Sequence, residues 1–209
     1  NYSYTETSSV SPSELMTGSD WLNQPNKSQK KYLDTEAVYR QFVYENYQTV
    51  DQGLEKTIAH LFDQDEFENT GIYSISQHIR DTLTKYMKYD EKTNTQSENV
   101  LEDFLNQKIS GNDVLFASAA VEAFRHYNIP ARYVEGYLLK SDAIDEEGNA
   151  TLTSKDGHAW VEVYFDGMGW LPIDVTPGYY YDVYTLMNMV ATPQEDNSQV
   201  NIEKGHKDS

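Results

Sequence analysis

The stretch GNDVLFASAAVEAFRHYNIPARYVEGY, residues 111–137, decides the fold. Its first half places small and apolar side chains at helical spacing, and the helix must end at Ile129-Pro130 because proline cannot continue a helix and restricts the residue before it. After the proline, apolar and polar residues alternate, which is typical of a strand. We therefore predict a helix over 113–127 and a strand over 131–139, with the small alanines of the helix allowing a sheet to approach closely.

A second stretch, HAWVEVYFDGMGWLPIDVTPG at residues 158–178, predicts two more strands. Alternation places them at 158–165 and 169–175, joined by the tight turn 166–169 with its two glycines. Upstream, apolar residues recur at helical spacing over 36–48, 51–62, 74–87 and 97–107. The predicted order is a set of helices, then a central helix, then an antiparallel sheet. This order is typical of an α+β fold.

Composition changes along the chain predict its organisation. Residues 1–34 are rich in Ser, Thr, Asn, Gln and Lys and read as a polar linker or arm, and residues 192–209 read as a disordered polar tail. Residues 35–191 form one domain with one core. The chain starts at Asn1 without a methionine or a signal peptide, so we expect it to be a segment of a longer protein.

Charge and cysteine content exclude several functions. The net charge of −18 opposes binding to nucleic acid or to an anionic membrane surface. No run of about 18 apolar residues occurs, so we expect membrane attachment only through flanking segments absent from this chain. The chain has no cysteine, which excludes disulfides, thiolate metal sites and catalysis by a thiol.

Together the two stretches resemble the transglutaminase-like family, whose fold is papain-like. The forms IPARYVEGY and GWxPxDxTPG are most similar to extracytoplasmic transglutaminase-like domains of bacterial membrane proteins. The resemblance implies N-terminal helices and a central helix packed on an antiparallel sheet, in the soluble extracytoplasmic domain of a membrane-anchored bacterial protein. The matching elements are Gly111, Phe116-Ala117, 129–134, Gly136-Tyr137, His158-Ala159-Trp160, Gly169-Trp170, Asp174 and 176–178.

The resemblance also implies a catalytic site whose nucleophile is missing. Active members carry a cysteine at the start of the central helix, and here that position is Asp113. His158 matches the imidazole that activates the thiol, and Asp174 matches the acid that orients the ring. Simple hairpin pairing would place His158 opposite residue 177, so we expect a strand offset or bulge near Pro172 to bring Asp174 to His158.

Asp113 leaves three functions open. A carboxylate is a poor nucleophile toward amides, but it suits a helix start as a cap and pairs with a protonated His158. This favours a cofactor-free pseudoenzyme that recognises a peptide, a protein or a cell-wall-associated chain. The alternatives are a peptide-amide hydrolase or acyl transferase that uses Asp113, His158 and Asp174 directly or through a divalent metal, and a scaffold without a ligand.

Four further residues are candidates for ligand binding, each with a structural alternative. Trp160 and Trp170 either contact ligand or are core aromatics beside the site. Arg132 either binds a substrate carboxylate or pairs with Glu135 or Glu162. Tyr179, which opens the cluster 179–181 and 184, either lines a peptide groove or closes the edge of the sheet.

Overall fold

The structure, a computed structural model, describes residues 24–69, 71–93, 99–139, 144–145 and 149–179. The predicted tail at 192–209, most of the predicted arm and the tyrosines at 180, 181 and 184 lie outside these residues. The elements in chain order are α3 (Lys27–Tyr47), α4 (Glu55–Phe62), α5 (Ile72–Tyr86), β1 (Lys88–Tyr89), α6 (Val100–Gln107), β2 (Ser110–Gly111), α7 (Asp113–His126), β3 (Ala131–Tyr137), the 3-10 turn η2 (Ser154–Asp156), β4 (Gly157–Phe165) and β5 (Gly169–Ile173).

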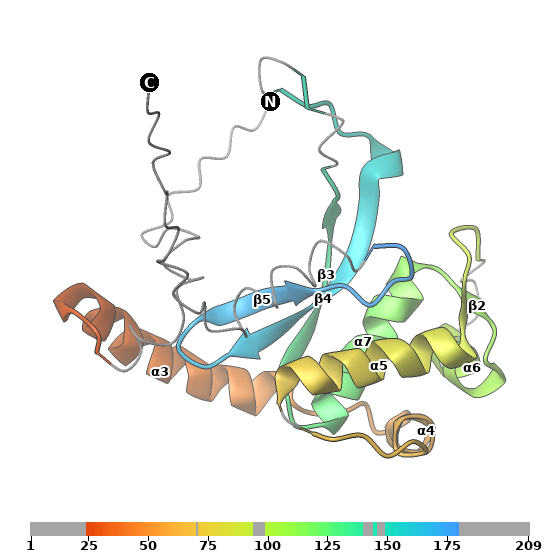
Figure 1. Ribbon diagram of the computed structural model, residues 1–209, viewed down its shortest axis with the longest axis horizontal. Helices are drawn as coiled ribbons and strands as arrows, with labels where there is room; N and C mark the ends of the chain where they lie inside the picture. The colour runs from red at the N-terminus through yellow and green to blue at the C-terminus, as the bar shows by residue number, and fades with distance from the viewer. Residues whose placement is uncertain (1–23, 70, 94–98, 140–143, 146–148, 180–209) are drawn as a thin grey trace, which may run out of the picture.

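The predicted α+β architecture is confirmed. Strands β3, β4 and β5 form an antiparallel sheet in that order, and the central helix α7 packs across β4 and β3. Val161 and Val163 of β4 are fully buried in the core with α7. Side chains alternate along a strand, so Tyr164 points to the opposite face, where its hydroxyl donates to Glu36 of α3. The sheet therefore lies between α7 and α3 (Figure 1).

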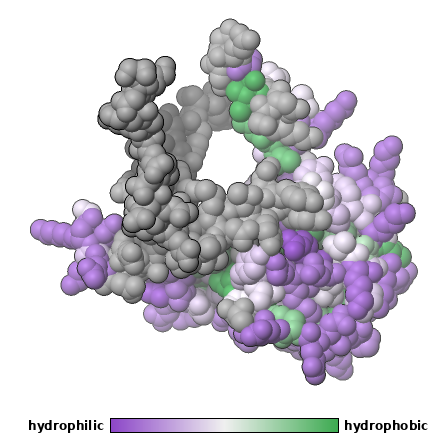
Figure 2. Space-filling view, in the orientation of Figure 1, coloured by the Kyte–Doolittle hydropathy of each residue, from purple (hydrophilic) through white to green (hydrophobic). Residues whose placement is uncertain are grey.

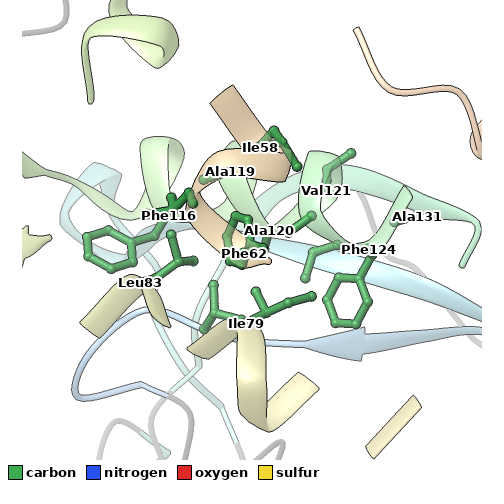
Figure 3. Close-up of a cluster of buried hydrophobic side chains, with 14 of the residues drawn as sticks. Ile58, Phe62, Ile79, Leu83, Phe116, Ala119, Ala120, Val121, Phe124 and Ala131 are labelled. Atoms are coloured by element: carbon green, nitrogen blue, oxygen red, sulfur yellow. The ribbon is translucent and has the colours of Figure 1, made fainter. Parts of the chain in front are cut away.

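The hydrophobic core joins the helices α4, α5, α6 and α7 to the sheet. Side chains of α4, α5 and α7 meet here, with Ala131 at the start of β3 beside them (Figure 3). Phe62, Phe116 and Phe124 are fully buried, and each contributes on the order of 1.5–3 kcal/mol by leaving water. Alanines on the inner face of α7 keep the helix close to the sheet, as the sequence predicts.

Helix α3 begins earlier than predicted. It starts at Lys27 instead of residue 36, because Asn26 and Gln29 form a capping box in which each side chain bonds the other residue's backbone. The first turns have few apolar residues, so periodicity does not reveal them, but the Tyr32 hydroxyl donates to the Met168 carbonyl at 2.9 Å. Residues 27–34 are therefore helix and do not belong to a linker.

A short parallel pairing that the sequence did not predict leads into α7. Strand β1 pairs with β2, and this pairing sets Tyr89 opposite Gly111. A β-carbon on Gly111 would lie 2.5 Å from Cε2 of the buried Phe104, which explains the glycine at this position. The pairing fixes the start of α7 and brings Tyr89 toward it.

On the face shown in Figure 2, the described residues are mostly hydrophilic, in keeping with the net charge of −18. Across the described ranges, no helix combines the length and apolar character needed to cross a bilayer.

Candidate functional site

Asp113 is the first residue of α7, and its carboxylate is directed to the sheet. The helix cap is Asn112, whose extended backbone lets its side-chain oxygen accept the Leu115 N–H at 3.2 Å. The expectation that Asp113 itself caps the helix is therefore wrong. Its Oδ2 instead accepts the backbone N–H of Ala159 at 2.9 Å.

His158 lies between two carboxylates. Its Nδ1 is 3.0 Å from Oδ2 of Asp113, and its Nε2 is 2.6 Å from Oδ2 of Asp174. Only 4% of the His158 side chain and 6% of the Asp174 side chain are exposed. The second oxygen of Asp174 accepts the Thr176 N–H at 2.9 Å, which fixes the carboxylate in place. The structure thus brings together the three residues that the resemblance placed in one site.

The strands reach this arrangement without the strand offset or bulge that we expected near Pro172. The β4–β5 register is continuous from Phe165 opposite Gly169 to Val161 opposite Ile173, with Pro172 paired in line. If this register continued for three more residues, His158 would lie opposite residue 176. Asp174 is then the diagonal neighbour of His158, which is within reach of a long side chain. The ladder ends at Ile173, which leaves the Ala159 N–H free to bind Asp113.

The two carboxylates determine the charge of the imidazole. Burial alone would lower the pKa of His158, but hydrogen bonds to Asp113 and Asp174 outweigh it and raise the pKa to about 9. Burial acts to raise the pKa of Asp113. The hydrogen bonds that Asp113 accepts from His158 and from the Ala159 N–H together outweigh burial and lower this pKa. At neutral pH the site is an imidazolium held between two carboxylates.

This protonation state limits the chemistry of the site. Both ring nitrogens of His158 donate hydrogen bonds, so neither has a lone pair to accept a proton from a nucleophile or to bind a metal. Among the residues that the structure describes, no group of three or more potential ligands is arranged to hold a metal ion. The sequence resemblance implies a thiolate partner for this imidazolium, and here the Asp113 carboxylate lies beside Nδ1.

Two aromatic side chains cover the imidazole. The ring of Tyr179 stacks on His158 with centroids 4.4 Å apart, and the ring of Trp160 stacks at 6.4 Å. Tyr89 hydrogen-bonds Tyr179 and meets its ring edge-on at 6.1 Å. A β-carbon on Gly136, a matched glycine, would lie 2.6 Å from Cη2 of Trp160, so the indole lies directly over this glycine. Tyr179 and Trp160 are the binding candidates that the structure places beside His158.

The other two binding candidates lie elsewhere on the sheet. Trp170 is edge-on to Tyr47 and Tyr164, and its Nε1 donates to the Tyr39 hydroxyl at 3.0 Å. The Arg132 guanidinium lies 4.4 Å from the Trp170 ring centre, and its Nε donates to Glu162 at 2.7 Å. Of the alternatives given for these residues, the structure shows the aromatic packing and the Arg132–Glu162 pair.

Sequence reasoning missed four contributors to the site. Tyr89 reaches it through the β1–β2 pairing, for which two-residue strands give no periodic signal. The Ala159 and Thr176 N–H groups belong to the backbone, and only the strand register reveals that they face carboxylates. Asn112 could have been found, because asparagine before an apolar helix is a cap signal.

Comparison with known proteins identifies the family of this chain. The model of the transglutaminase-like superfamily matches residues 63–175. The chain is 37% identical over 87 residues to the uncharacterized protein YebA of Bacillus subtilis, a match that covers 39% of this chain and 12% of YebA. It is 38% identical over 77 residues to a protein-glutamine gamma-glutamyltransferase of Pseudomonas aeruginosa, with 36% and 11% covered. The matches thus span about a tenth of these relatives.

A solved structure resembles the chain in part. The periplasmic domain of TgpA from Pseudomonas aeruginosa superposes with a TM-score of 0.47 and 19% identity, over 72% of this chain and 50% of that one. The superfamily model covers more than half of the present chain and includes Asp113, His158 and Asp174. The chain belongs to the transglutaminase-like superfamily.

Proposed function

We propose that this domain is a catalytically degenerate transglutaminase-like domain that recognises peptide segments, including those of cell-wall-associated chains. The observation that carries the proposal is His158, whose two ring nitrogens are bound by Asp113 and Asp174. This arrangement keeps the shape and charges of a thiolate–imidazolium pair but provides neither a thiol nor a free base. A site of this kind can hold the polar groups of a peptide without cleaving it.

The aromatic residues beside the site support peptide binding. Trp160 and Tyr179 present flat apolar rings next to a charged centre, which is the combination found in pockets that fix the orientation of a ligand. A carboxamide N–H can donate a hydrogen bond to the Asp113 carboxylate, which remains an acceptor beside the charged His158. The relative from Pseudomonas aeruginosa is named for glutamine chemistry, so a glutamine peptide is the rational first probe.

The proposed location is outside the cytoplasm, in the soluble domain of a membrane-anchored bacterial protein. The form of the two motifs and the absence of cysteine support this location. The pseudoenzyme assignment and the location are independent, since either can hold without the other.

The competing function is a peptide-amide hydrolase or acyl transferase that uses Asp113. The intact His158–Asp174 pair favours it. Against it, attack by the Asp113 carboxylate would give a high-energy mixed anhydride, and the carboxylate would first have to release both His158 and the Ala159 N–H. A route through a metal would require His158 to lose a proton that two carboxylates hold in place.

One titration separates these functions. A blocked Gln-Gly dipeptide is added to the isotopically labelled protein, and amide chemical shifts and ammonia release are recorded on the same sample. We expect shifts at Ala159, Trp160 and Tyr179 and no ammonia above the protein-free blank. Ammonia above the blank would support the hydrolase, and a titration that moves none of these amides up to the solubility of the dipeptide would contradict recognition at this site.

The sheet offers a matched pair of control variants. Trp160 and Trp170 lie on neighbouring strands, but only Trp160 stacks on His158. We expect Trp160→Ala to abolish the titration shifts and Trp170→Ala to retain them. Equal loss in both variants would indicate a general disturbance of the sheet.

A further inference from the structure

Strand β3 has an outer edge that lies apart from the Asp113–His158 site. In the part of the chain that the structure describes, β3 pairs only with β4. The Leu138 N–H donates to the Asp156 carbonyl at 2.8 Å and the Tyr164 N–H donates to the Pro130 carbonyl at 3.0 Å. Hydrogen-bonded pairs alternate along an antiparallel ladder, so the even-numbered residues of β3 bond to β4. The N–H and C=O groups of Tyr133, Glu135 and Tyr137 therefore point away from the sheet.

Tyr133, Glu135 and Tyr137 also place two aromatic rings and one carboxylate along this edge. Tyr133 and Tyr137 are exposed, the latter by 60%, and Glu135 lies between them on the same face. The Tyr133 hydroxyl donates to Oε1 of Glu135. Natural edge strands are usually protected by charged side chains, especially lysine, by proline or by a bulge, and between residues 131 and 137 β3 has no lysine, proline or bulge but carries the charges of Arg132 and Glu135.

The edge is also accessible in shape. The end of β3 and the start of β4 continue as a two-stranded ribbon beyond the helical layer (Figure 1). Apolar atoms lie on this projecting part (Figure 2), and Leu139 and Leu152 are exposed there. An unpaired, partly apolar strand edge is a template for the addition of another strand.

Charge selects the occupant of the edge. A second copy of the chain, paired antiparallel with Glu135 at the centre of the pairing, would set Glu135 opposite its own counterpart, and like charges directly opposite are destabilising. Two molecules of net charge −18 would also repel each other. A segment with Lys or Arg opposite Glu135 and apolar residues opposite the two tyrosines avoids both costs.

We propose that the free edge of β3 binds an extended cationic polypeptide segment, which adds to the sheet as a fourth strand with a basic residue opposite Glu135. The segment would lie two strand spacings, about 10 Å, from β4, the strand that carries His158. The interaction uses β3 backbone groups and Glu135, so it goes beyond the function proposed for the Asp113–His158 site and does not depend on it.

Amide hydrogen exchange tests the proposal residue by residue. In the free protein we expect fast exchange at Tyr133, Glu135 and Tyr137 and slow exchange at Arg132, Val134 and Gly136. Addition of the probe acetyl-TVTKTVT-amide should slow the three odd-numbered amides alone. Slow exchange of these amides before any addition would show that the chain itself covers the edge and would overturn the proposal, as would a probe that changes none of them.

Two modified probes and one variant give the matched controls. N-methylation of the Val, Lys and Val residues of the probe removes the donors that face β3, and we expect at least about a hundredfold loss of affinity. N-methylation of the central threonines should leave binding intact. Glu135→Lys should weaken the lysine probe about fivefold to tenfold and favour a probe with Glu at the central position. Equal effects of the two methylation patterns, or no change in charge preference, would contradict strand addition.

Discussion

An Asp113→Cys variant is expected to gain a thiol that is far more acidic than free cysteine. The new side chain occupies the first position of α7 and lies beside Nδ1 of His158, so the helix dipole and the imidazolium both stabilise the thiolate. We expect its pKa to fall well below the free value of about 8.5, and iodoacetamide to alkylate it at mildly acidic pH about tenfold to a hundredfold faster than a free thiol. The wild-type protein, which has no cysteine, should not be labelled.

Matched variants separate the two causes of this acidity. Lys27 is the exposed first residue of α3, so Lys27→Cys places a thiol at the same helix position without an imidazole. We expect only a small lowering of its pKa, and the double variant Asp113→Cys, His158→Gln should resemble it. The pKa of each thiol is read from the ultraviolet absorbance of its thiolate, which does not depend on whether iodoacetamide can reach the sulfur. If the thiol at residue 113 is no more acidic than the one at residue 27, the partners do not keep catalytic geometry.

The stability of the protein is expected to fall as pH rises above 6.5. The pKa of His158 is about 9 in the folded state against about 6.5 when unfolded, so its contribution is complete below pH 6.5 and is lost as pH rises through 9. The shift corresponds to a loss of about 3 kcal/mol in the free energy of unfolding. The pKa of Asp113 is lowered, so its contribution is present above the unfolded value of about 3.9 and is lost in acid. The site therefore stabilises the fold most between about pH 4 and 6.5.

Urea unfolding of the wild type and of His158→Gln over this range measures the effect. The difference in free energy between them should shrink by about 3 kcal/mol from pH 6 to pH 10. A difference that does not change with pH would contradict the account.

The sequence predicts most of the fold because the decisive signals are local. The alanine-rich face of α7, its stop at Pro130 and the alternation in β4 each specify one element within a few residues of its bounds. The start of α3 could not be predicted from periodicity, since its first turns are fixed by the cap at Asn26 and by a contact with Met168, which is distant in sequence.

The sequence predicts which residues form the candidate site but not the hydrogen bonds between them. The motif resemblance identifies Asp113, His158 and Asp174. Simple hairpin pairing predicted an offset or bulge between His158 and Asp174, but none is present, because Asp174 is close enough as the diagonal neighbour of His158. Which carboxylate binds which ring nitrogen, and that Asp113 also binds the Ala159 N–H, depend on the strand register and on where the ladder ends. The stacking of Tyr179 depends on the turn at 176–179, which has no periodic signal.

The central claim is that His158 is an imidazolium fixed between Asp113 and Asp174, and the proposal of a site that binds without catalysis rests on it. A pH titration of the labelled wild-type protein by nitrogen NMR observes this ring directly. The account predicts that both Nδ1 and Nε2 carry protons at neutral pH and that the ring titrates with a pKa of about 9. A ring with one unprotonated nitrogen at neutral pH, titrating at or below its ordinary value of about 6.5, would contradict it.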